Sequence, residues 1–240
     1  MFKTVALLFV AYIAALFLIP TLVGGNGIFE SAFESNTGLK IFLYIIIMSH
    51  LTITMMSLSF HRYHTHKGVI INKFLDTFMQ TWLWFVTSMS KLDWVSVHIY
   101  HHAHSDQNKD PHSPVQKGFW RVFLLGIVDY AAAKDDPEVL KIRKVIKTNK
   151  YERFIAAYSL SGPIVLTLFN FLAFGMFWGS ILSIINFGIS PLFAVGGVNA
   201  VAHMWGYKNH KTSDNSRNIG FLFPLNFIIC GELDHNNHHA

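Results

Sequence analysis

The sequence has a single cysteine, Cys230, among its 240 residues. One cysteine excludes an intrachain disulfide and a thiolate metal cluster, so nitrogen or oxygen must hold any metal. Charged residues are also scarce, at 14% of the chain, whereas 52% of the residues are apolar and 15% are aromatic. A composition so poor in charge is unusual for a soluble domain of this length and favours an integral membrane protein.

The sequence also lacks the motifs of several other classes of protein. It contains no Gly-rich dinucleotide fingerprint, no haem-attachment motif and no cysteine set for an iron–sulfur cluster, so redox chemistry would need an external electron donor. The net charge of +5 does not indicate nucleic acid, because the basic residues flank apolar stretches and form no separate basic domain. No repeat or linker divides the chain, and we expect one domain over residues 1–240.

Long apolar runs predict four membrane-spanning helices. Two lie at about residues 5–23 and 40–60, and the uncharged stretch from Phe154 to Val198 is long enough for two more, at about 154–174 and 178–198, with a turn near Gly175 to Gly179. The first run has no convincing signal cleavage site, so we interpret it as a retained helix. The predicted fold is an all-α integral membrane protein with two helical hairpins and a cytoplasmic helical cap that carries the histidine clusters.

The basic residues predict how this protein is oriented in the membrane. Of the 19 Lys and Arg residues, 14 lie in residues 61–153, three follow the last predicted span, and one stands on each side of the first. The positive-inside rule then places both termini and the regions 61–153 and 204–240 on the cytoplasmic side. All the histidine clusters would share that side of a multi-pass membrane protein.

Most of the 14 histidines crowd into three clusters at the ends of predicted spans. The clusters are His61-Arg-Tyr-His64-Thr-His66, His98-Ile-Tyr-His101-His102-Ala-His104 and His235-Asn-Asn-His238-His239. In HxxHH, positions i, i+3 and i+4 share one helix face and can aim three imidazoles at a common point. In the first cluster, an α-helix would point His66 about 140° away from His61, so spacing alone favours His64.

A further polar pair, Asn199 and His203, is spaced i, i+4 at the end of the fourth predicted span, where polar side chains are costly. Neutral imidazole suits iron, copper, zinc and nickel, and so many nitrogen donors exceed what one ion can use. Two metals are therefore expected, with iron favoured if O₂ chemistry is the task. The roles of His104 and His112 stay open, and a lone His such as His50 is more often hydrogen-bonded than a ligand.

These residues resemble the membrane-bound fatty-acid desaturase family, specifically its stearoyl-CoA type, whose three histidine boxes have the spacings HxxxxH, HxxHH and HxxHH. Here the boxes are His61 to His66, His98 to His102 and His235 to His239. The resemblance covers about residues 40–240 and includes Asp110-Pro111-His112 after the second box and Asn199-Ala-Val-Ala-His203 before the third. One box alone is a weak signal, whereas three boxes in this order are a specific one.

The resemblance implies an O₂-dependent di-iron desaturase that introduces a cis double bond, at Δ9, into a long-chain fatty acyl substrate. The implied ligands of the two iron ions are His61, His66, His98, His101, His102, His203, His235, His238 and His239, with Asn199 acting through a bound water. The family pattern thus selects His66 over His64, which requires a non-ideal helix at the first box. From their positions beside His98 and His203, we expect Trp94 and Trp205 to contact the substrate.

The resemblance also implies partners and leaves alternatives. The enzyme would act in the lipid bilayer on an acyl-CoA, an acyl carrier protein thioester or a phospholipid, with electrons from a ferredoxin- or cytochrome-type donor. Relatives usually continue past the third box, so a chain that ends at Ala240 is expected to be truncated. The first alternative is a membrane lipid hydroxylase with the same boxes. The second is a membrane metal-binding or transport protein. That alternative predicts ionisable or ligand residues within the spans, but the last two predicted spans contain none before His203.

Overall fold

The computed structural model describes residues 37–189 and 196–240, together with residues 11, 14, 15 and 18. Within these residues the regular elements are helices, accompanied by two isolated β-bridges that join Asn218 to Tyr207 and to Asp234. The predicted all-α fold is therefore confirmed for the described part of the chain. The first predicted span, at residues 5–23, lies almost entirely outside it.

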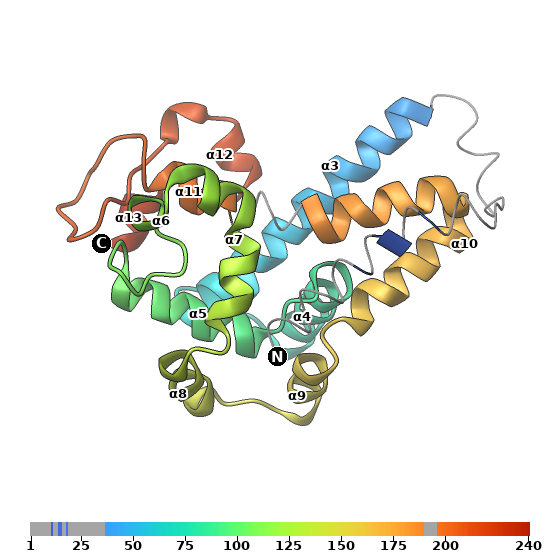
Figure 1. Cartoon of the computed structure of the whole chain (residues 1–240), viewed down its shortest axis with the longest axis horizontal. Coiled ribbons are helices and arrows are strands. Elements are labelled where there is room, and N and C mark those ends of the chain that lie inside the picture. The colour runs from blue at the N-terminus through green and yellow to red at the C-terminus, as the bar shows by residue number, and fades with distance from the viewer. Residues whose placement is uncertain (1–10, 12–13, 16–17, 19–36, 190–195) are drawn as a thin grey trace.

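The helices are arranged in two parts. Helix α3 and helix α10 extend to one side of the molecule, and the C-terminal helices gather on the other side, next to α5 and α7 (Figure 1). Along the chain the elements are α3 (Thr37–Met55), η1 (Met56–Thr65), α4 (Lys73–Thr87), α5 (Lys91–His104), α6 (Pro114–Lys117), α7 (Phe119–Ala133), α8 (Pro137–Val145), α9 (Lys150–Ala157), α10 (Ser161–Ile184), η2 (Ile185–Ile189), α11 (Val198–Ala202), η4 (Gly220–Leu222), α12 (Leu225–Ile228) and α13 (His235–His239).

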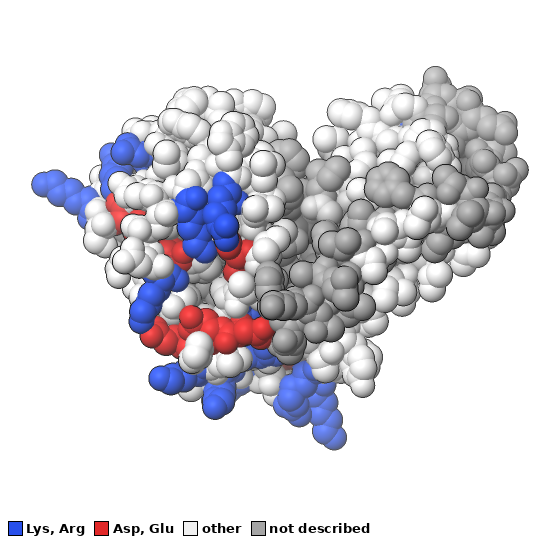
Figure 2. All heavy atoms as spheres, in the orientation of Figure 1, with Lys and Arg blue, Asp and Glu red and all other residues white. Residues whose placement is uncertain are grey.

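Two helical stretches of the described residues are long and apolar enough to cross a membrane, Gly38–Thr65 and Ser161–Gly188. The first contains the span predicted at 40–60 but continues to Thr65, because α3 runs directly into η1. Charged side chains avoid this part of the molecule. In the view of Figure 2 the Lys, Arg, Asp and Glu side chains gather away from α3 and α10; α10 has no charged residue and α3 has one, Lys40, near its start.

Helix α10 consists of two arms that meet at Gly175, where φ is 75° and ψ is 172°. Such a positive φ is readily adopted only by glycine. The arms lie side by side, since Asn170 Nδ2 donates to Ser183 Oγ at 3.0 Å. The predicted turn near Gly175 is thus present. The arm 161–174 is about 21 Å long, short of a bilayer core of about 30 Å, so four full spans are not confirmed and stay a prediction.

The third predicted span begins later than expected. Its helix starts at Ser161, not at residue 154, because α9 ends at Ala157 and the chain turns before Pro163 can take a place in the first turn of α10. Proline lacks the amide that a helix interior needs and is tolerated in a first turn. Charge patterning alone did not reveal this break, since both helices are uncharged from Phe154 onwards.

The start of α10 packs directly on α4. A Cβ on Gly162 would lie 2.2 Å from the carbonyl oxygen of Trp84, and Trp84 Nε1 donates to the carbonyl of Tyr158 at 3.0 Å. We expect Gly162→Ala to lower the free energy of unfolding by about 1–3 kcal/mol, because the methyl group forces the two helices apart. Thermal unfolding in detergent measures this. Gly188→Ala is the control, since its Cβ would meet nothing within 4 Å, and equal melting temperatures for the two variants would contradict the expectation.

Candidate metal centre

The first histidine cluster lies on η1, which is a π-helix. In a π-helix the hydrogen bonds join residues five apart, and His66 N donates to His61 O at 3.1 Å. The two imidazoles therefore lie on one face, with ring centroids 5.0 Å apart. His64 turns to α4 instead, where its Nε2 lies 2.9 Å from Asp76 Oδ1. The preference for His64, which assumed an α-helix, is wrong: His66 is the neighbour of His61.

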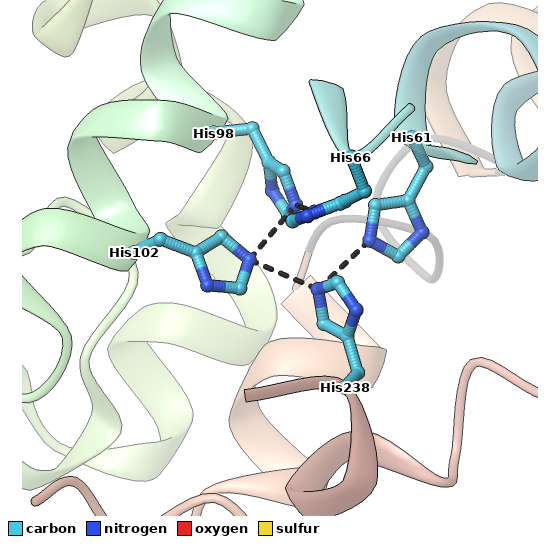
Figure 3. Close-up of side chains that lie close together, drawn as sticks. All are labelled: His61, His66, His98, His102 and His238. Carbon is cyan, nitrogen blue, oxygen red and sulfur yellow. Dashed lines mark hydrogen bonds between the residues drawn. The ribbon is translucent and has the colours of Figure 1, made fainter. Parts of the chain in front are cut away.

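The nine histidines that the family resemblance selects come together in two groups. Within each group, one ring nitrogen of every residue lies within 4.8 Å of the others. Figure 3 shows the first group, whose rings point toward one another from η1, α5 and α13. The five-histidine group is His61, His66, His98, His102 and His238, and the four-histidine group is His101, His203, His235 and His239.

Each HxxHH box serves both groups. In the second box His98 and His102 belong to the five-histidine group and His101 to the other, whereas in the third box only His238 belongs to the five-histidine group. The expectation that a box aims three imidazoles at one point is therefore wrong. At about 100° per residue, positions i and i+4 lie about 40° apart, while i+3 lies about 60° to the other side of i, so the box diverges toward two points.

The short approaches between ring nitrogens fit metal ligation. His238 Nε2 lies 2.9 Å from both His61 Nε2 and His102 Nε2, and His203 Nε2 lies 3.0 Å from His235 Nε2. A ring nitrogen carries one proton or one lone pair, so mutual hydrogen bonds cannot satisfy a whole group. Two nitrogens bound at right angles, each about 2.1 Å from one ion, would be about 3.0 Å apart.

Two orphaned atoms support the same fit. The Nε2 atoms of His101 and His239 are buried and have no hydrogen-bond partner among the described residues. A buried polar atom without a partner is costly, and a metal ion in the four-histidine group would remove that cost. The residues present therefore fit two nitrogen-ligated metal ions, one for each group.

Four carboxylates contact histidines of both groups, on the side of each imidazole that faces away from the other histidines of its group. Each accepts a hydrogen bond from an Nδ1 atom, at distances of 2.7–3.1 Å, which leaves the Nε2 lone pair to face the group. The pairs are His61 with Glu232, His101 with Asp110, His203 with Asp106, and His239 with Asp214. Sequence analysis assigned none of these roles. Only Asp110 stood in a noted motif, and nothing in the spacing of the other three reveals their partners.

Burial and charge keep these groups in the protonation states that metal binding requires. Burial, and then the neighbouring histidines, lower the pKa of His102 to about 2, so its imidazole is neutral at neutral pH. Burial alone would raise the pKa of Asp110, but the contact with His101 and the amide of His112 outweigh it and hold that pKa below its usual value. A histidine that binds a metal is neutral and commonly donates its other ring N–H to a carboxylate, as His101 does to Asp110.

A cavity reaches both groups. His61, His98 and His235 line it on the metal side together with Asn199, and apolar side chains of Ile53, Met56, Trp94 and Val97 line it elsewhere. Trp94 also stacks on His98, with ring centroids 4.4 Å apart, which agrees with its expected place beside the site. Trp205 is 51% exposed and packs on Phe119 instead, so the structure does not place it on this cavity.

The remaining histidines have other surroundings. His112 is buried and lines the same cavity, next to the ring of His101 at 5.7 Å. His104 lies outside both groups, and its Nδ1 donates to the carbonyl of Tyr100 at 3.2 Å. His112 is thus a residue of the cavity wall, and His104 is a hydrogen-bonded side chain outside the two groups.

The fold and the site define the class of protein: a helical, membrane-associated protein whose histidine boxes converge on two groups able to bind metal. The family model for fatty acid desaturases matches residues 38–240. This chain therefore belongs to the fatty acid desaturase family, as its boxes predicted.

Individual relatives agree with the family. The chain is 30% identical over 199 residues to the Delta-9 desaturase-like 1 protein of Arabidopsis thaliana, covering 81% of this chain and 64% of that protein. It is 32% identical over 189 residues to Delta-9 acyl-lipid desaturase 2 of Arabidopsis thaliana, covering 77% and 59%. It is 32% identical over 197 residues to the acyl-CoA C20 Delta5-desaturase of Anemone leveillei, covering 77% and 57%. The chain thus spans about three fifths of the length of these relatives.

The geometry of η1 predicts different outcomes for its two candidate histidines. We expect His66→Ala to lose bound metal, because it removes a donor from the five-histidine group. We expect His64→Ala to keep the metal but to lower the free energy of unfolding by about 1–3 kcal/mol, since Asp76 loses a buried partner. Metal analysis of purified protein and thermal unfolding measure the two effects. Full metal content in His66→Ala with loss in His64→Ala would reverse the assignment.

The carboxylate behind His239 is predicted to tune metal binding. Replacing Asp214 by Asn weakens the hydrogen bond to His239 Nδ1, and we expect a loss of about 10–100-fold in metal affinity. Competition with a chelator measures the affinity. Asp135→Asn, on the turn between α7 and α8, is the matched control and should bind metal like the unchanged protein. An unchanged affinity in Asp214→Asn would show that this carboxylate does not support a ligand.

Proposed function

We propose that this protein is an O₂-dependent di-iron fatty acyl desaturase that introduces a cis double bond, at Δ9, into a long-chain substrate. The observation that carries the proposal is the convergence of nine histidines on two adjacent groups: seven lie in η1, α5 and α13, and His66 and His203 directly follow η1 and α11. The names of two relatives include Delta-9 and support that position, although a third acts as a Delta5-desaturase by its name.

The ligands in this proposal are the nine histidines, with Asn199 acting through a water. Asn199 lines the cavity together with histidines of both groups, which supports such a role. Bound iron would supply the activation of O₂ that removes hydrogen from an unactivated methylene group. The hydroxylase alternative uses the same kind of boxes, so the product must distinguish them. The transport alternative is disfavoured by membership of the desaturase family.

The contribution of this chain's own residues is to position the acyl chain and exclude water. The apolar lining of the cavity, with Ile53 and Met56 from the α3–η1 helix and Val97 from α5, suits a hydrocarbon chain lying beside His98 and His235. Trp94 stacks on the ring of His98 and limits its rotation. This one contact therefore joins the cavity wall to the five-histidine group. Fixed geometry of this kind selects which pair of carbons reacts.

We also propose a multi-pass protein whose histidine groups face the cytoplasm. The 14 basic residues between 61 and 153 support this orientation by the positive-inside rule. A ferredoxin- or cytochrome-type protein supplies the electrons, since these 240 residues contain no motif for a second redox cofactor. The substrate is an acyl-CoA, an acyl carrier protein thioester or a phospholipid.

The test is gas chromatography with mass spectrometry of total fatty acids from a bacterial host that expresses the chain, with double bonds located by derivatisation. We expect a new monounsaturated acid with the unchanged protein and none with His101→Ala, which removes a donor from the four-histidine group. His104→Ala is the matched control, because it lies outside both groups, and should retain the product.

Each outcome of this experiment has a defined meaning. A double bond at another position would correct Δ9 and keep the desaturase. Hydroxy acids would replace it with a hydroxylase. If iron-loaded protein in the membrane, supplied in turn with a ferredoxin-type and a cytochrome-type donor and their reductases, forms neither product, the proposed activity of this chain is wrong.

A further inference from the structure

A compact loop before the third histidine box exposes many apolar side chains. The apolar loop, residues 220–231, is closed at its neck by Ile219 N donating to Leu233 O at 2.8 Å, and the sequence from Ile219 to Gly231 has no charged residue. Its exposed members are Phe221, Leu222, Phe223, Leu225, Phe227 and Ile228. An uncharged stretch of about 10–14 residues is a buried core segment or a re-entrant or interfacial one, and exposure excludes the first.

The chain that leaves this loop runs along one face of the α3–η1 helix. His50 Nδ1 donates to the carbonyl of Ile228 at 2.7 Å, and Ser57 Oγ donates to Glu232 at 2.5 Å. Between them, Thr54 Oγ1 lies 3.3 Å from Cys230 Sγ. Positions 50, 54 and 57 lie on one helix face, and their partners 228, 230 and 232 follow one another in the same order, so the end of the loop lies along this face of the helix.

These contacts set the depth of the loop. His50 is 11 residues before His61, which corresponds to about 16 Å along the helix. A bilayer core is about 30 Å thick, so a helix that crosses it with its histidine box at the surface carries His50 near the middle. Ile228 and Phe227 then lie at the same depth, well inside the hydrocarbon region.

The backbone of the loop is suited to that environment. Ile228 N and Ile229 N donate to the carbonyls of Pro224 and Leu225, at 3.0 Å each, and Gly231 N donates to Asn226 O at 2.8 Å. The carbonyl of Cys230 accepts from the Arg62 guanidinium. Irregular backbone enters a membrane only where its polar groups are paired within the protein, and the groups named here are paired in this way.

The surface of the loop continues the surface of the span. Leu43, Ile46 and Ile47 on α3 are exposed next to His50, which contacts the loop. In Figure 2 the spheres over α12 are uncharged, like those over α3. Together the loop and α3 present one apolar surface without a charged side chain between Ile219 and Gly231 or between Ile41 and Phe60.

We propose that the apolar loop is a re-entrant membrane segment, inserted beside α3 from the side of the histidine groups and covered by lipid acyl chains. The inference rests on the proposed function in one respect, that α3 crosses the bilayer. It also changes the expected topology, because part of the region 204–240 then lies within the membrane. The turn that ends the loop brings Glu232 to His61, so the inserted loop would anchor the third box to the first.

Spin-label accessibility in vesicles of phosphatidylcholine and phosphatidylglycerol tests the proposal. Single cysteines replace Phe227, Ile46 and Val145 in the full chain with Cys230→Ser. Phe227 is 76% exposed and Val145, on the charged helix α8, is 78% exposed, so the two form a matched pair, while Ile46 reports on α3. We expect the spin labels at Phe227→Cys and Ile46→Cys to collide often with O₂ and rarely with a water-soluble nickel chelate. We expect the label at Val145→Cys to show the reverse.

The outcomes separate this inference from the topology on which it rests. If the label at 227 behaves like that at 145 while the label at 46 is lipid-exposed, the re-entrant loop is wrong and the span stands. If the labels at 46 and 227 both collide with the nickel chelate, the span itself is wrong. If the label at 227 is shielded from both reagents, a protein surface covers the loop and the inference is overturned. Unchanged metal content verifies the fold of each variant.

Discussion

The hydrogen bond from His66 N to His61 O is the constraint on which the candidate metal centre depends. It belongs to a π-helical turn, which brings together two side chains that an α-helix would point about 140° apart. Without it His66 would leave the five-histidine group, and His64 would be drawn away from Asp76. One local change in helical pitch thus satisfies two requirements, a donor for the group and a buried partner for an acidic side chain on α4.

The second requirement is that distant parts of the chain meet. Glu232 accepts from Ser57 and from His61, so it joins the helix of the first box to the segment that precedes the third. Asp106, after the second box, accepts from His203 Nδ1 at 2.9 Å and from the amide of Asn215 at 2.7 Å. These carboxylates orient histidines of the two groups and also connect the boxes to one another. Their buried charges are stabilised by the hydrogen bonds that they accept from these side chains and from a backbone amide.

The sequence predicted the composition of the site better than its geometry. The boxes and the family pattern named the nine histidines that converge, and the apolar runs located α3 and the turn at Gly175. What spacing could not give was the pitch of η1, because the choice between α and π depends on packing around His61 and His66. The break before Ser161 was missed because no charged residue marks it, and Asp106, Asp214 and Glu232 were missed because their partners are distant in sequence.

The division of each HxxHH box between the two groups has a mechanical consequence. On α5 and again on α13, histidines of both groups are attached to one short helix, so any displacement of that helix moves members of the two groups together. The distance between them is set by the angular repeat of the helix, about 100° per residue, and not by loop length. A change in a surface loop can therefore tilt the pair as a unit, but widening the gap between its members would require unwinding a helix.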